Sequence, residues 1–316
     1  MKILIFGAGG VGSVLGGFLA RTGHAVSLLG RPWHLDVIKK DGLTISGIWG
    51  NYRIKAFDLY TEVSQIKEPD FDLIILTVKA YDTQKALQEL LPLIKERTML
   101  LSLQNGLGNL EILLKKVSPK QFLAGRVIFG VETSPGQVKV TVNADDVVLG
   151  AMPGAIPVLS PERMASVFQN SKIPTKAVPN ILTFLWAKVI YNSALNAICA
   201  VYEMPYGKIL ENEQTKKSME AIVRECYAVA LKKGVELEPQ TAEEYLELLS
   251  GSLIPKTALH FPSMLQDLKK GKPIDIDALN GAICRMGKEL GVPTPENQKA
   301  VEAVLDKMSS EAKIKN

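Results

Sequence analysis

Three strongly polar side chains interrupt an otherwise apolar stretch, residues 181–202, which reads ILTFLWAKVIYNSALNAICAVY. Lys188, Asn192 and Asn196 follow one another at intervals of four, so on a helix they share one face within about 12 Å. A lysine can protonate a carbonyl oxygen as hydride arrives at the carbon, and two amides can hold the carboxylate and hydroxyl of a small acid. The alternative is a lysine whose stem packs on the helix, with both asparagines bonded to neighbouring loops. We favour a substrate site, because burying an unpartnered lysine is costly.

A second candidate site is the glycine-rich run Gly7-Ala8-Gly9-Gly10-Val11-Gly12, which fits G-x-G-x-x-G between an apolar strand-like run and a helical pattern. In such a loop the first glycine permits a tight turn and the second lets the backbone approach a pyrophosphate. The third lets the helix pack on the strand, and the helix N-terminus offers N–H groups to the anion. We therefore predict a dinucleotide site rather than a purely structural turn.

The end of the second expected strand, residues 24–29, distinguishes between the two nicotinamide dinucleotides. Residues 28–32 read LLGRP, so the Asp or Glu that holds the ribose hydroxyls in many NAD enzymes is missing there. Arg31 instead offers a planar guanidinium that can pair with a 2′-phosphate. We expect NADP(H), with a solvated loop arginine as the alternative.

Two more loops follow expected parallel strands, at the sheet edge where ligands bind. Lys79 lies in TVKAY (77–81) and Asn105 in QNGLG (104–108). An amide followed by glycines can lie against a nicotinamide or a substrate, but Asn-Gly is also a common turn, so both interpretations stay open. In a third stretch Asp275 and Asp277 fall near the start of a helix, where carboxylates are often only caps.

Alternating strand-like and helical patterns position these residues. Strands are expected at 2–6, 24–29, 73–78 and 99–103, helices at 82–91, 108–116 and 162–169, and strands joined by turns within 122–149. A two-proline segment, residues 173–180, is expected to be a hinge, and beyond it every long run has a helical period. We predict an α/β Rossmann-type doubly wound domain, residues 1–178, followed by an all-α domain, residues 179–316.

The composition excludes several classes of protein. A length of 316 residues fits about two domains, and 47% hydrophobic with 22% charged residues is typical of a globular chain rather than a disordered one. A net charge of +4 argues against a broad nucleic-acid-binding face. Three well-separated cysteines indicate a reducing compartment, the cytoplasm, and three histidines without cysteine neighbours predict no metal site. Six glycines between residues 7 and 17 disfavour a signal peptide, so we expect the mature protein to begin at residue 1.

Five motifs, in this order, make the sequence resemble the ketopantoate reductase (2-dehydropantoate 2-reductase) family over essentially the whole chain. They are GAGGVG at 7–12, TVKAY at 77–81, QNGLG at 104–108, WAKVIYNSALN at 186–196 and SMLQDLKKGKPIDIDALNG at 263–281. The resemblance implies an NADPH-dependent oxidoreductase that reduces a 2-oxo acid to a 2-hydroxy acid on the route to pantothenate and coenzyme A. It also implies a Rossmann domain followed by a helical domain, with the active site in the cleft between them.

The resemblance further implies roles for individual residues. Matches to substrate-contacting positions are the catalytic lysine (Lys188), two asparagines (Asn192, Asn196), a serine (Ser263) and an asparagine that also serves the cofactor (Asn105). Matches to cofactor positions are the arginine at the 2′-phosphate (Arg31) and the lysine after the fourth strand (Lys79).

Two positions depart from the family pattern. Asp275 replaces a common glutamate and is one methylene shorter; we still expect it to orient Lys188 or to contact the nicotinamide ribose. Tyr206 stands where some members carry asparagine, and this bulkier residue raises the alternative of a different 2-oxo acid.

Two rival functions share parts of this pattern. A β-hydroxyacid dehydrogenase also carries a lysine four residues before an asparagine, but its Asp-x-Asn-type motif after the second strand is absent here. A non-catalytic NADP-binding regulatory protein is disfavoured by the retained Lys188. We expect a small 2-oxo acid as partner, expect neither nucleic acid nor a membrane, and leave a homodimer open.

Overall fold

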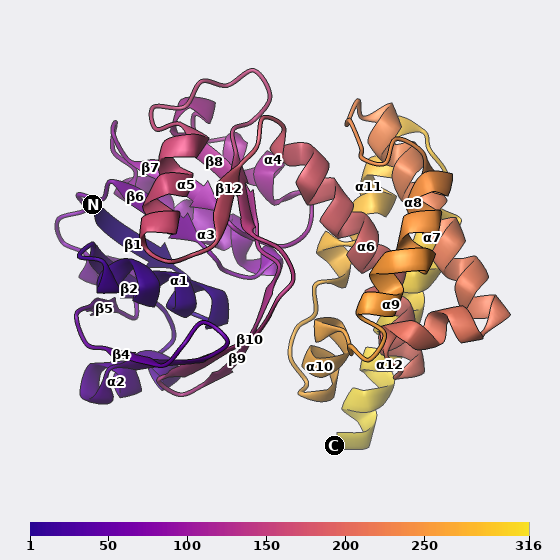
Figure 1. Ribbon diagram of the computed structural model, residues 1–316, viewed down its shortest axis with the longest axis horizontal. Helices are drawn as coiled ribbons and strands as arrows, with labels where there is room; N and C mark the ends of the chain where they lie inside the picture. Colours follow the sequence, from indigo (N-terminus) through magenta and orange to yellow (C-terminus); the bar gives the residue numbers. More distant parts are fainter. Residues whose placement is uncertain (316) are drawn as a thin grey trace. The chain divides into compact units, whose positions relative to one another are not determined.

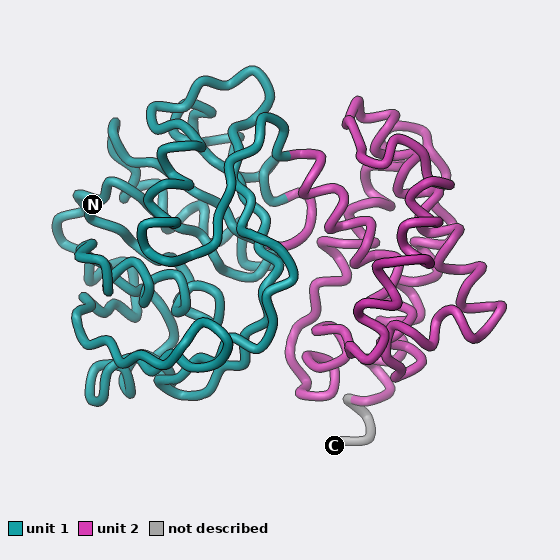
Figure 2. Tube along the Cα trace, in the orientation of Figure 1, with its two compact units in different colours: residues 1–104, 109–181 teal, residues 105–108, 182–316 magenta. Residues whose placement is uncertain are grey.

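The computed structural model describes residues 1–315 and falls into two compact units (Figure 2). Unit 1 comprises residues 1–104 and 109–181, and unit 2 comprises residues 105–108 together with the chain from Leu182 onward. The sequence placed the boundary after residue 178, whereas unit 1 extends to Ile181 and one short loop of the first half of the chain belongs to unit 2. Asn316, the last residue of the expected helical domain, lies outside the described residues.

Unit 1 is built on an eight-stranded sheet with the order β12-β11-β8-β7-β6-β1-β2-β5 (Figure 1). Its strands are β1 (Lys2–Phe6), β2 (Ala25–Leu29), β5 (Asp58–Tyr60), β6 (Leu73–Leu76), β7 (Met99–Ser102), β8 (Phe122–Arg126), β11 (Val147–Gly150) and β12 (Thr175–Ala177). All neighbouring pairs are parallel except β8 and β11. Central strand β1 is buried on both faces, with Ile3, Leu4 and Ile5 fully inaccessible, as expected for a parallel sheet between layers.

Helix α1 (Gly10–Arg21) packs between this sheet and a second, four-stranded one, whose strands are β4 (Tyr52–Ile54), β3 (Leu43–Gly47), β10 (Gln137–Asn143) and β9 (Phe129–Ser134) in spatial order. Two adjacent glycines permit this close approach. A Cβ on Gly16 would lie 2.8 Å from Leu28 of the main sheet, and one on Gly17 would lie 2.5 Å from Ile45 of the second sheet. The strands within 122–149 are confirmed, whereas β3, β4 and β5 were not predicted.

The other helices of unit 1 are α2 (Pro32–Asp41), α3 (Thr83–Leu90), α4 (Asn109–Leu114) and α5 (Pro161–Asn170). The segment expected to be a hinge, residues 173–180, instead contains the edge strand β12, which pairs in parallel with β11. Pro174 and Pro179 bracket this strand without interrupting it, because a proline is tolerated just outside a strand.

Unit 2 is all-α, as predicted. Its helices are α6 (Ile181–Tyr202), α7 (Glu213–Lys232), α8 (Ala242–Leu248), α9 (Ile254–Lys256), α10 (Ser263–Lys269), α11 (Asn280–Leu290) and α12 (Pro295–Lys315), with short helical turns η5 (Tyr206–Glu211), η6 (Leu249–Leu253) and η7 (Ile276–Ala278). Every residue of α6 from Ser193 to Ala200 is buried, which confirms the expected central helix. By length and apolarity α6 could also cross a membrane, but 67% of that apolar window is buried inside the structure, as in the core helix of a globular protein.

Candidate functional site

The glycine-rich loop leads from β1 into α1, and two of its glycines are required by the protein itself. Gly7 has φ +107°, and its carbonyl oxygen accepts a hydrogen bond of 2.8 Å from the hydroxyl of Thr77. A Cβ on Gly12 would lie 2.5 Å from that same oxygen. Thus Gly7 makes the turn and Gly12 lets the helix approach the strands, as the pattern predicts.

Gly9 differs from these two glycines. A Cβ on Gly9 would meet no heavy atom within 4 Å among the described residues, and its φ of −89° is open to any amino acid. The first turn of α1 has neither a capping side chain nor an acidic residue, so no side chain of the cap position bonds to the first N–H groups of the helix. The loop therefore fits a pyrophosphate, which needs room at the backbone and N–H donors.

The remaining loop residues serve packing. Gly10 faces β9, where an added Cβ would lie 2.6 Å from Thr133 Oγ1. Ala8 is buried, and a Cβ on Gly30 at the end of β2 would lie 3.0 Å from its methyl group. Val11 packs at the margin of the unit 1 core.

Two cationic side chains follow the strands that flank β1. Arg31 is exposed directly after β2, where its carbonyl oxygen caps the first turn of α2, and it forms no ion pair with any described residue. Lys79 is exposed after β6, immediately before a short helical turn at Ala80–Asp82. Both lie at the carboxyl edge of the sheet, which suits binding of a phosphorylated nucleotide.

A buried histidine supports the helix that begins after Arg31. His34 is fully inaccessible; its Nδ1 lies 3.1 Å from the Gly136 backbone nitrogen and 3.2 Å from the Ser134 carbonyl oxygen, and its Nε2 lies 3.0 Å from Ser13 Oγ. Burial lowers the pKa of His34, and the hydrogen bond to the Ser134 carbonyl opposes this shift. His34 thus joins α2, α1 and the β9–β10 turn. Its role could not be predicted from the sequence, because its partners are distant in the chain.

In unit 2, Lys188 on α6 meets the loop that follows β7. Its Nζ donates a hydrogen bond of 2.5 Å to Asn105 Oδ1. That loop rests on η7: the Leu107 N–H donates to the Ala278 carbonyl at 2.8 Å, and a Cβ on Gly106 would lie 2.6 Å from Ala278. The structure therefore brings together two candidate residues that the sequence placed in separate motifs.

Lys188, Asn192 and Asn196 share one face of α6 and are called the α6 stripe below. The two asparagines of this stripe have different surroundings. Asn192 is half-buried and its side chain has no hydrogen-bond partner among residues 1–315. Asn196 is only 4% exposed, and its Oδ1 accepts a hydrogen bond of 2.7 Å from the Tyr206 hydroxyl. The stripe thus presents a lysine, an open amide and an anchored amide along one face.

Asp275 and Ser263 lie in the motif that leads to α11. Ser263 is exposed at the first position of α10, and Asp275 is half-buried directly before η7, with Oδ1 fully enclosed. Asp277 instead pairs with Arg285, whose second nitrogen donates to the Asp277 carbonyl at 2.9 Å. Asp277 is therefore a local structural residue.

The amide beside Asn105 is structural as well. Gln104 is buried, and its Nε2 donates to Thr83 Oγ1 at 2.8 Å and to the Val78 carbonyl at 3.1 Å. It ties the loop after β7 to the loop after β6. Gln104 thereby sets where the chain leaves the sheet before Asn105.

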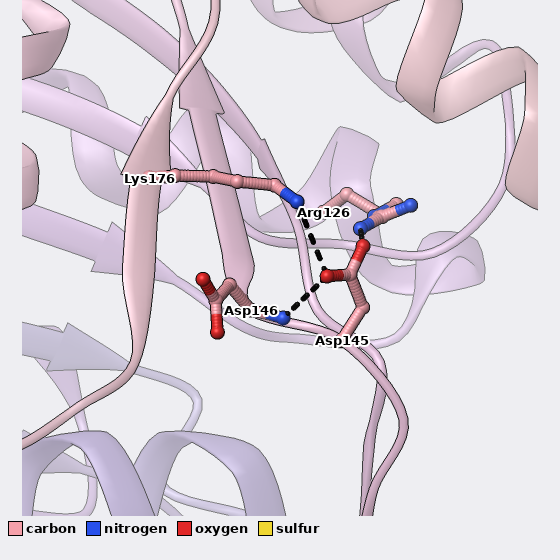
Figure 3. Close-up of polar contacts among 4 residues, drawn as sticks. All are labelled: Arg126, Asp145, Asp146 and Lys176. Carbon is pink, nitrogen blue, oxygen red and sulfur yellow. Dashed lines mark hydrogen bonds and ion pairs between the residues drawn. The ribbon is translucent and has the colours of Figure 1, made fainter.

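A charged cluster outside these motifs holds three strands of unit 1 together (Figure 3). Asp145 pairs with the 8%-exposed Arg126 of β8 and, at 3.2 Å, with Lys176 of β12, and it accepts from the Asp146 N–H at 2.8 Å. Burial alone would raise the pKa of Asp145, but these hydrogen bonds together lower it. The carboxylate is thus paired with two cationic side chains, which suits a structural role.

Both parts of the chain are similar to known proteins. The family model described as "Ketopantoate reductase PanE/ApbA" matches residues 3–154, and its C-terminal counterpart matches residues 180–307. The 2-dehydropantoate 2-reductase of Aquifex aeolicus is 39% identical over 301 residues, 94% of each chain.

Two solved structures are similar over nearly their full length. A PanE/ApbA family ketopantoate reductase from Ralstonia eutropha JMP134 is 31% identical with a TM-score of 0.87, covering 99% of this chain and 100% of that chain. A D-mandelate dehydrogenase in a ternary structure with NADH and anilino(oxo)acetate is 31% identical with a TM-score of 0.86. The match covers 98% of this chain and 99% of that chain.

Proposed function

The chain belongs to the ketopantoate reductase family, and from this premise we propose that it reduces 2-dehydropantoate to pantoate with NADPH, as a cytoplasmic enzyme of pantothenate biosynthesis. Membership makes it a nicotinamide-dependent oxidoreductase. The substrate, the preference for NADPH and the pathway are the finer parts of the proposal.

The observation that carries the proposal is the contact between Lys188 and Asn105 on the face that also bears Asn192. An ammonium group held at 2.5 Å from an amide oxygen has a defined direction and is a proton donor. Lys188 would donate a proton to the keto oxygen as that oxygen gains negative charge.

The cofactor would be held by residues of unit 1. Bound NADPH would supply the hydride that reduces the keto carbon. The backbone around Gly9 and the start of α1 would bind the pyrophosphate, Arg31 would pair with the 2′-phosphate, and Lys79 would add a second positive charge. In this proposal residues 1–178 form the cofactor domain and residues 179–316 the catalytic one.

The substrate would be held by polar side chains of unit 2. The two amides of the α6 stripe and the exposed hydroxyl of Ser263 offer donors to a carboxylate and a hydroxyl group. Asp275, with its partly enclosed carboxylate, would orient Lys188 or the nicotinamide ribose, and Asn105 would contact both ligands.

A second substrate class is supported by the aromatic side chains around the stripe. The Tyr206 ring lies 5.8 Å from that of Tyr191 and 5.2 Å from that of His260, measured between centroids. A 2-oxo acid with a planar apolar side chain would pack against such rings. The similar D-mandelate dehydrogenase was solved with anilino(oxo)acetate, a ligand of that kind.

The proposal is tested by NADPH oxidation with 2-dehydropantoate, 2-oxoisovalerate and benzoylformate, together with identification of each product. We expect kcat/KM to be highest for 2-dehydropantoate. A clear preference for benzoylformate would instead favour the second class. NADP binding without turnover of any 2-oxo acid would contradict the reductase proposal and favour a regulatory protein, whereas oxidation of 3-hydroxy acids alone would favour a β-hydroxyacid dehydrogenase.

A further inference from the structure

Tyr206 lies between two segments of unit 2 that carry candidate substrate residues. It begins η5, which follows α6, and its side chain reaches back to Asn196 on that helix with a hydrogen bond of 2.7 Å. Its backbone N–H donates to the His260 carbonyl at 3.0 Å, three residues before Ser263. A single residue therefore links α6 to the segment that leads into α10.

The Tyr206 ring is held in place on several sides. It is 4% exposed and makes an edge contact with Tyr191, at an interplanar angle of 88°, and a tilted contact with His260. Thr257 donates its hydroxyl hydrogen to the Leu253 carbonyl at 2.8 Å, so the Tyr191 hydroxyl, 2.9 Å from Thr257 Oγ1, is itself the donor there. Tyr191, the neighbour of the Tyr206 ring, is therefore held by a hydrogen bond of its own.

Close packing of the backbone keeps this arrangement. The Gly207 N–H donates to the Ala258 carbonyl at 2.9 Å, and a Cβ on Gly207 would lie 2.9 Å from the Ala258 methyl group. The start of η5 thus lies directly on residues 258–260, which fixes the backbone from which the Tyr206 side chain extends. Burial raises the pKa of Tyr206 well above its ordinary value, so the hydroxyl keeps its hydrogen throughout the physiological range.

The hydrogen bond from Tyr206 determines how the Asn196 amide is oriented. Because the Tyr206 hydroxyl donates to Oδ1, the amide nitrogen must lie on the opposite side of the group. That nitrogen has no hydrogen-bond partner among the described residues, yet it is not among the fully enclosed atoms. It therefore keeps two N–H donors for a molecule that is not protein.

We propose that Tyr206 is a positioning residue that holds the Asn196 amide with its nitrogen toward the substrate, so that Asn196 binds the acid as a donor. This inference rests on the proposed reduction of a 2-oxo acid. A carboxylate only accepts hydrogen bonds, so it is attracted by the N–H groups of an amide and repelled by the oxygen. The two orientations of a free asparagine amide differ by a half-turn, and in the structure the Tyr206 hydroxyl bonds to the one in which Oδ1 faces it.

A double-mutant cycle tests the proposal through Tyr206→Phe, Asn196→Ala and the combined variant. Phenylalanine keeps the ring contacts and removes only the hydroxyl. We expect Tyr206→Phe to raise KM for the 2-oxo acid about tenfold with little change in kcat, because one charge-assisted contact is lost. In the Asn196→Ala background the same change should have no further effect.

Two further variants separate positioning from general stability. Tyr227→Phe is the matched control, because Tyr227 is another buried tyrosine of unit 2, bonded to the Pro239 carbonyl at 3.0 Å outside the stripe. It should lower the melting temperature without changing KM. Asn196→Asp keeps an acceptor for Tyr206 but offers the acid a negative charge, so it should weaken substrate binding more than Asn196→Ala does.

The outcomes separate this inference from the proposed function. Suppose that the wild type reduces a 2-oxo acid but the increases in KM caused by Tyr206→Phe and Asn196→Ala simply multiply in the combined variant. The positioning role is then overturned while the proposed function stands. The same holds if Asn196→Asp binds the acid better than Asn196→Ala does. If Tyr206→Phe and Tyr227→Phe change KM equally, the effect is one of stability and the role is again overturned. If the wild type reduces no 2-oxo acid, the proposed function fails and this role fails with it.

Discussion

Lys188 Nζ and Asn105 Oδ1 lie 2.5 Å apart, although 83 positions separate them in the sequence. Their meeting depends on Gly106, whose φ of +87° and close approach to Ala278 exclude any side chain. Because the Leu107 N–H also bonds to the Ala278 carbonyl, the Asn105 loop belongs to the helical unit in its packing. The direction of the Lys188 ammonium group is therefore set by a loop that leaves the other unit's sheet.

The first prediction concerns this pair. Lys188→Ala should lower kcat by about 10²- to 10⁴-fold, the usual contribution of a proton donor. Asn105→Ala leaves the lysine in place without this acceptor. It should lower kcat about tenfold, which corresponds to roughly one hydrogen bond. Steady-state rates of NADPH oxidation measure both, with circular dichroism as a control for folding. An unchanged kcat in Lys188→Ala would remove the lysine from the proton transfer.

The second prediction separates two glycines of the same loop. Gly9→Ala should leave the melting temperature unchanged, because its Cβ enters open space at an ordinary φ, but should weaken NADPH binding at least tenfold. Gly12→Ala should destabilise the protein by about 1–3 kcal/mol, because its Cβ would collide with the Gly7 carbonyl. Thermal unfolding and titration calorimetry with NADPH measure the two effects. Tight NADPH binding by Gly9→Ala would show that the phosphates lie elsewhere.

The third prediction concerns cofactor choice. Arg31→Asp should weaken NADPH binding by about 10- to 100-fold, since a charge-assisted contact to the 2′-phosphate contributes about 1.5–3 kcal/mol. The new carboxylate can accept from the ribose hydroxyls, so NADH should be used relatively better. The ratio of kcat/KM for the two cofactors reports the change, and Lys39→Asp, a substitution at an exposed lysine of α2, is the control. An unchanged ratio would make Arg31 a loop residue only.

The fourth prediction concerns acidic pH. The pKa of His34 is lower in the folded protein than its unfolded value of 6.5, so the unfolded chain binds more protons as the pH falls. The stability due to neutral His34 is complete above pH 6.5 and should be lost as the pH falls from there toward the folded pKa.

Melting temperatures of the wild type and His34→Gln, measured between about pH 5 and 8, test this expectation. His34→Gln should have a lower melting temperature than the wild type at neutral pH. Its melting temperature should fall less steeply than that of the wild type as the pH is lowered. Burial also lowers the pKa values of His24 and His260, which remain in both proteins, so the difference between the curves isolates His34. Parallel curves would contradict the prediction.

Much of the local structure followed from residue patterns. The strand at Lys2–Phe6, helix α1 and the strands near residues 73 and 99 lie where expected, because apolar periodicity and glycine punctuation act within a few residues. The small second sheet was missed because β3 and β4 are short and β3 is joined to the rest of the sheet by β10, about ninety residues later in the chain. The expected hinge became β12 for the same reason, since only its partner β11 makes it a strand.

The sequence by itself determined the kind of chemistry: the glycine loop, Arg31 and the Lys188 stripe are local patterns whose meaning depends on spacing. Only the tertiary structure decided which groups meet. It paired Lys188 with Asn105, anchored Asn196 on Tyr206 and placed Gly136 against His34. The physical reason is that a hydrogen bond needs its donor and acceptor within about 3 Å, and packing between distant segments decides which atoms come that close.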